Sequence, residues 1–127
     1  SSAASGRRSN RAQLSACARL LRRPDAALEY AETARTAYPE EPQAWFAAGI
    51  ARVLLNRFEA ALQDFEAYER RLPGNPQTIF YRGRCYEGLG QREAAIALYR
   101  RYLESGVDGE EADYARRRLK EWGALSS

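Results

Sequence analysis

Apolar residues recur every three or four positions along most of the chain, which is the spacing of one face of an α-helix. Proline and glycine interrupt this pattern at intervals, as at Pro24, Pro42 and Gly90. The pattern therefore predicts an all-α protein, with helices near residues 8–22, 25–37, 42–55, 58–71, 76–89, 92–105 and 110–122.

The helical pattern itself repeats with a period of 34 residues and without an insertion. The second repeat carries Trp45, Gly49, Ala61 and Phe65, and the third carries Ile79, Gly83, Ala95 and Tyr99 at the same places. The first repeat is degenerate, because Arg11 and Ser15 stand where the second has Trp45 and Gly49. We therefore expect three helical hairpins, at residues 8–41, 42–75 and 76–109.

The residue types at the repeated positions indicate how each hairpin closes. Glycine inside a helix costs about 1 kcal/mol relative to alanine, a penalty that is tolerated where two helices approach closely. We expect Gly49 and Gly83 to mark such approaches, with Ala61 and Ala95 as the small residues that face them. Large side chains such as Trp45 would then fill the gaps around the contact.

These residues resemble the tetratricopeptide repeat, whose pattern is an aromatic residue, a small glycine, a second aromatic residue, then alanine, aromatic, alanine and proline. The match covers residues 8–109 in three consecutive copies and is best in the second repeat. The resemblance implies a solenoid of stacked hairpins, in which the first helix of each pair lines a concave surface and the second lies on the convex side. Such a surface implies a protein or peptide partner.

The segments outside the repeats have simpler expected roles. In residues 110–122, one face carries Ala112, Ala115, Leu119 and Trp122, which suits a helix that caps the open end of the stack. We expect residues 1–7 to be a flexible lead-in and residues 123–127 a tail. The chain contains no methionine, so we expect it to derive from a longer translation product.

The complete absence of histidine restricts the chemistry that the chain can perform. It excludes histidine-dependent nucleophilic catalysis, histidine-ligated zinc and the HExxH motif of metalloproteases. We therefore expect no catalytic residue, no metal site and no cofactor. Cys17 and Cys85 lie two repeats apart, too far for a disulfide, and are expected to be small buried side chains.

The formal net charge of +3 is concentrated near the N-terminus, where six arginines precede the first acidic residue, Asp25. Nucleic-acid binding usually needs a basic stripe along one face rather than a basic end, so we expect no nucleic-acid partner. No apolar run approaches the roughly 20 residues of a membrane-spanning helix. The basic residues Arg116, Arg117 and Arg118 are interpreted as a solvated face, with a docking patch as the alternative.

The resemblance places the partner-binding surface on particular positions of each repeat. Repeat geometry implies a groove lined by Arg19, Gln43, Phe46, Ile50, Val53, Gln77, Phe80, Tyr81, Arg84 and Glu87. The apolar members would bind an apolar or aromatic segment, and the arginines would bind an acidic group. Packing of Phe46 against Phe80 between repeats is a compatible alternative. The lysine, asparagine and arginine of the carboxylate clamp that binds chaperone C-termini are absent from the corresponding positions.

Two other hypotheses remain open besides a stand-alone interaction module. The residues from Tyr114 to Gly123 resemble the endings of some bacterial envelope zinc metalloproteases, so the chain could be the non-catalytic tail of such an enzyme. Alternatively, the degenerate first repeat or the capping end could mediate self-association into a homo-oligomer. The compartment is not determined: a bacterial cytoplasm or periplasm fits, with the chain soluble or tethered through a preceding segment.

Overall fold

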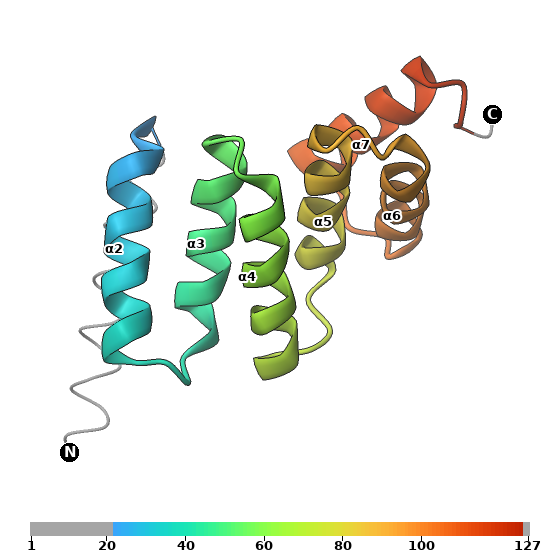
Figure 1. The fold of residues 1–127 in the computed structure, drawn as a ribbon. Helices are drawn as coiled ribbons and strands as arrows, with labels where there is room; N and C mark the ends of the chain where they lie inside the picture. The colour runs from blue at the N-terminus through green and yellow to red at the C-terminus, as the bar shows by residue number, and fades with distance from the viewer. Residues whose placement is uncertain (1–21, 126–127) are drawn as a thin grey trace. The chain divides into compact units, whose positions relative to one another are not determined.

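A computed structural model of the chain describes residues 22–125 (Figure 1). The described part contains α-helices and no strand. The helices are α2 (Pro24–Ala37), α3 (Pro42–Leu54), α4 (Phe58–Arg71), α5 (Pro76–Gly88), α6 (Arg92–Glu104) and α7 (Glu110–Glu121). Each lies within about one residue of a helix predicted from the periodicity, so the all-α prediction is confirmed. The helix predicted near residues 8–22 falls almost entirely outside the described residues.

The helix ends follow from residues that favour starts and tight turns. Proline begins α2, α3 and α5, where its fixed φ angle suits the first helical turn and its missing N–H costs no hydrogen bond. Asn56 and Gly90 end the turns inside the second and third hairpins with φ angles of 60° and 76°. They stand one period apart, and asparagine and glycine are the residues that adopt this left-handed conformation most readily.

The chain divides into two compact units, Ser1–Pro73 and Gly74–Ser127. In the first, the described helices are α2, α3 and α4, and α3 packs against both of the others (Figure 1). In the second, α6 packs against α5 and α7. The division falls between Leu72 and Pro76, the turn that the proline and glycine content predicts.

Alanine contacts join α2 and α3 in the first unit. Ala27 and Ala31 of α2 and Ala48 and Ala51 of α3 are fully buried and belong to one cluster, together with Leu28. Small side chains let the two helix backbones approach closely.

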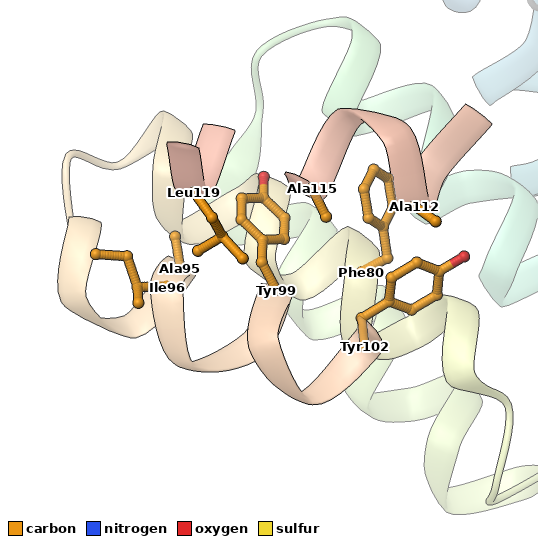
Figure 2. Packing of buried hydrophobic residues seen from close by; sticks show 8 residues of the cluster. All are labelled: Phe80, Ala95, Ile96, Tyr99, Tyr102, Ala112, Ala115 and Leu119. Atoms are coloured by element: carbon orange, nitrogen blue, oxygen red, sulfur yellow. The ribbon is translucent and has the colours of Figure 1, made fainter. Parts of the chain in front are cut away.

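Aromatic residues dominate the core of the second unit. Figure 2 shows this core, which consists of Phe80, Ala95, Ile96, Tyr99, Tyr102, Ala112, Ala115 and Leu119. Ala112, Ala115 and Leu119 come from α7 and are fully buried, as expected for the apolar face of a helix that covers the end of a hairpin.

The two helical glycines each lie beneath an aromatic ring. A Cβ atom added at Gly49 would lie 2.7 Å from the ring of Phe65, and one added at Gly83 would lie 2.7 Å from the ring of Tyr99. The expected close approach is therefore present in both hairpins. The nearest atoms, however, belong to the aromatic residue of the second helix and not to Ala61 or Ala95, which are fully buried one helical turn before it.

Trp45 was expected to fill a gap in the core, but it is only partly buried. Its ring lies between the guanidinium groups of Arg35 and Arg71, at 4.6 Å and 4.4 Å from the ring centroid. Its indole N–H donates a hydrogen bond to the carbonyl oxygen of Pro39 at 3.1 Å, and Arg71 Nε donates to the same oxygen. Trp45 therefore joins α2, α3 and α4 near the turn between α2 and α3.

Candidate partner-binding surface

The predicted groove residues of α3 differ widely in exposure. Gln43 is exposed, Phe46 and Ile50 are partly exposed, and Val53 is buried, with 3% of its surface accessible. A residue as buried as Val53 cannot contribute appreciable surface to a partner in this conformation. The expectation that Val53 lines an open surface is therefore wrong.

Leu54 is a surface residue of α3 that the repeat positions did not include. Its exposed fraction is 46%, the largest of any large hydrophobic residue in the described part. It follows Ile50 by four residues and Ala47 by seven, a spacing that places all three on one side of the helix with Gln43. This apolar spacing is visible in the sequence. It was missed because the family positions carried over stop at residue 53.

Phe46 belongs partly to the packing of the hairpin. Its ring centroid lies 5.7 Å from that of Phe65 and 4.9 Å from that of Tyr68, both on α4. Aromatic pairs at such distances stabilise the fold beyond the area that they bury. A substitution at Phe46 would therefore disturb the hairpin as well as its surface.

In α5, Phe80 is a core residue. Its exposed fraction is 2%, and its ring contacts those of Tyr81, Tyr99, Tyr102 and Tyr114 at centroid distances of 5.1 to 5.8 Å. The expectation that Phe80 is an exposed binding residue is wrong, because α6 and α7 cover it. Gln77 and Tyr81 remain partly exposed on α5, and burial raises the pKa of the Tyr81 hydroxyl.

Glu87 was predicted to face a partner, but it receives hydrogen bonds inside the second unit. Its carboxylate accepts from the hydroxyl of Tyr99 at 2.7 Å and from that of Tyr114 at 2.9 Å. Arg118 Nε lies 3.2 Å from the same carboxylate. Glu87 thus ties α5 to α6 and α7. Burial, followed by the hydrogen bond to Glu87, raises the pKa of both tyrosine hydroxyls, so they remain protonated donors.

Arg84 lies on α5 next to the capping helix. Its guanidinium carbon is 4.6 Å from the centroid of the Tyr114 ring, and that of Arg117 is 5.8 Å from the same centroid. Within residues 22–125, neither of these two arginines forms an ion pair with a carboxylate. Arg84 was predicted from the repeat positions, whereas Arg117 had been interpreted as part of a solvated face, with a docking patch as the alternative.

A network of ion pairs connects the three described helices of the first unit. Asp64 of α4 is 2% exposed and forms ion pairs with Arg52 at 2.5 Å and Arg35 at 3.2 Å. Arg52 also contacts Glu32 at 3.0 Å, so the network connects all three helices. Burial raises the pKa of the Asp64 carboxyl, although both arginines oppose that shift. Because these groups satisfy one another, we interpret the network as structural.

The remaining expectations concern metals, membranes and the N-terminal residues. Residues 22–125 contain no group of three or more metal-ligating side chains, and none of their helices has the length and apolar character needed to cross a bilayer. Cys85 is fully buried, as predicted. Arg19 and Cys17 lie outside the described residues.

The helical hairpins, the 34-residue period and the glycine contacts define an all-helical repeat protein. Comparison with protein families gives the same class: tetratricopeptide repeat models match residues 18–76 and residues 77–105. The chain therefore belongs to the tetratricopeptide repeat family. No curated protein matches it.

Proposed function

We propose that the chain binds a partner protein or peptide through the exposed side of α3, formed by Gln43, Ala47, Ile50 and Leu54. Tetratricopeptide repeats are generally protein-interaction modules and typically non-catalytic, which supports the general class of function. The observation that carries the more specific proposal is the 46% exposure of Leu54, one turn after the partly exposed Ile50. Complete burial of a fully exposed aliphatic side chain of this size is worth about 1.5 to 3 kcal/mol, so burial of the exposed half of Leu54 would contribute roughly half of that to association.

The surrounding residues suit such a contact. Gln43 adds a polar side chain at one end of the apolar row, and Ala47 packs against the α2–α3 core beneath it. Apolar residues at the centre with polar residues at the edge are typical of interfaces between proteins. Gln77 and Tyr81 of α5 form a second predicted contact surface, which is tested separately.

The test compares proteins captured by the immobilised full chain and by a variant with Ile50→Ser and Leu54→Ser. We expect the variant to keep its far-ultraviolet circular dichroism spectrum and to bind the captured partner about tenfold or more weakly, because two apolar contacts are lost. The matched control is Leu72→Ser, since Leu72 is 44% exposed but lies in the turn after α4.

Equal loss of binding in the control and in the α3 variant would contradict the proposed surface. A variant with Gln77→Ala and Tyr81→Ser shows whether α5 contributes. Sedimentation across a range of concentrations tests the alternative of self-association, which a mass constant at 14.4 kDa would exclude.

A further inference from the structure

Two arginines in the second unit, Arg84 and Arg117, contact the ring of one tyrosine, Tyr114, and we call these three residues the positive site. Arg84 of α5 and Arg117 of α7 both lie against the ring of Tyr114, with guanidinium carbons 4.6 Å and 5.8 Å from its centroid. Neither has a carboxylate partner within the described part of the chain. This differs from Arg116 and Arg118 of the same helix, which pair with Asp113 and with Glu87 and Glu121.

The geometry of arginine on an aromatic ring leaves its hydrogen-bonding capacity available. Cation–π contact uses the face of the guanidinium group, whereas its five N–H donors point outward in the plane of the group. Contact with the ring also restricts the long side chain, so less conformational entropy is lost when an anion binds. Arg84 and Arg117 therefore present oriented donors for which residues 22–125 supply no carboxylate acceptor.

Glu87 holds the ring that supports both arginines. The hydroxyl of Tyr114 donates to the two oxygens of this carboxylate at 2.9 Å and 3.1 Å, and the ring also contacts Phe80 and Tyr99 edge to face. The acidic residue nearest in sequence to Arg84 is thus engaged by tyrosines and by Arg118. It orients Tyr114, while Arg84 remains available.

We propose that Arg84 and Arg117, supported by Tyr114, bind the carboxylates of an acidic segment of the partner protein. The inference rests on the proposed function, because it specifies the chemistry of a partner that an interaction module would bind. Each guanidinium group can donate two parallel N–H···O hydrogen bonds to the two oxygens of a carboxylate, and the opposite charges strengthen these bonds. The positive site extends over only a small part of the surface, because three acidic residues of the first turn of α7 precede it: Glu110, Glu111 and Asp113. A long polyanion such as nucleic acid would therefore be repelled by these carboxylates.

The first test uses a fluorescein-labelled peptide of alternating glutamate and serine, with a glutamine–serine peptide as the uncharged probe. Fluorescence anisotropy with the full chain at low salt should show binding of the glutamate peptide only. In the double variant Arg84→Gln, Arg117→Gln, we expect affinity about tenfold or more lower, because charge-assisted hydrogen bonds are lost. The control Arg101→Gln, Lys120→Gln removes the same charge from exposed positions of α6 and α7.

Two results would overturn the inference. Equal weakening in the test and control variants would show that only net charge matters, and tighter binding of a single-stranded oligonucleotide than of the glutamate peptide would favour a nucleic acid. A second measurement does not depend on whether the arginine variants fold, because it uses the unmodified protein. The side-chain Nε–Hε resonance of Arg84 should shift on addition of the glutamate peptide. An unchanged resonance contradicts the inference.

The Ile50→Ser, Leu54→Ser variant separates this inference from the proposed function. We expect it to bind the captured partner about tenfold or more weakly and to keep its affinity for the glutamate peptide, because both arginines are unchanged. If partner binding depends on α3 but not on Arg84 and Arg117, the inference fails and the proposed function stands. If the glutamate peptide binds through the arginines but the α3 variant retains its partner, the α3 surface is wrong.

Discussion

The two units contain the same aromatic packing one 34-residue period apart, but charged residues surround it in the first unit and aromatic residues in the second. Phe46 contacts the rings of Phe65 and Tyr68 in the first unit, as Phe80 contacts those of Tyr99 and Tyr102 in the second. The residues around these rings differ. In the first unit Asp64 forms ion pairs with Arg35 and Arg52, whereas in the second unit the rings of Tyr114 and Trp122 contact Phe80 and Tyr99.

The difference follows from single positions of the repeat. Arg52 and Asp64 form a buried ion pair, whereas the residues one period later are Tyr86 and Leu98, which cannot form one. The glycine contact and the aromatic centre are therefore the features that the two hairpins share. The periphery can be charged or aromatic, provided that its polar groups are satisfied.

The largest effect is expected at Tyr99, the central ring of the second unit. It is fully buried, covers Gly83, stacks on Trp122 and donates to Glu87. Tyr99→Ala should lower the free energy of unfolding by about 3 to 5 kcal/mol, as for other buried aromatic truncations. Urea titration followed by circular dichroism measures this change. Tyr99→Phe, which loses only the hydroxyl, should cost about 1 kcal/mol.

Alanine at each helical glycine tests whether the shared contact is equally tight in both units. The added Cβ would lie 2.7 Å from the ring of Phe65 or Tyr99, so one of the two must shift. Gly49→Ala and Gly83→Ala should each destabilise the protein by about 1 to 3 kcal/mol, measured by the same titration. An unhindered helical position would instead gain up to about 1 kcal/mol, and such a gain would show that the ring is not confined.

Arg52 and Tyr86 occupy the same repeat position and test the difference between the units. Arg52→Met removes the closest ion-pair partner of the buried Asp64 and leaves, among residues 22–125, the pair with Arg35. We expect a loss of about 1 to 3 kcal/mol, since a buried acceptor loses a hydrogen bond. Tyr86→Phe is the matched change in the second unit and should alter stability by less than about 0.5 kcal/mol. Equal effects would mean that the network contributes nothing distinctive.

The smallest effect concerns the pH dependence of the first unit. Burial raises the pKa of the Asp64 carboxyl above its ordinary value of 3.8, with Arg52 and Arg35 opposing the shift. The folded state then holds the proton more tightly than the unfolded chain, so this group's contribution to stability falls as the pH rises from 3.8 through the raised pKa. The stability of the wild type relative to Asp64→Asn should fall over that interval in urea titrations. A rise in the relative stability of the wild type would show that the two arginines lower the pKa of Asp64 by more than burial raises it.

The described helices and the 34-residue period could be predicted from the sequence because both depend on local spacing and on proline and glycine. The exposure of individual side chains could not. Phe80 is buried and Glu87 is engaged because α7 brings Tyr114 and Arg118 against them, a contact between segments about 30 residues apart. Trp45 likewise meets Arg35 and Arg71 from two other helices. Spacing within one helix carries no information about such neighbours.

The placement of Trp45 and Trp122 has a spectroscopic consequence. The chain contains two tryptophans, one in each unit, and each indole lies against guanidinium groups: Arg35 and Arg71 in the first unit, Arg92 and Arg118 in the second. Replacing either indole by phenylalanine would leave a single tryptophan, and excitation at a wavelength that tyrosine does not absorb would make its emission report on one unit. The emission of the two single-tryptophan proteins during denaturation would then reveal whether both halves of the chain melt together.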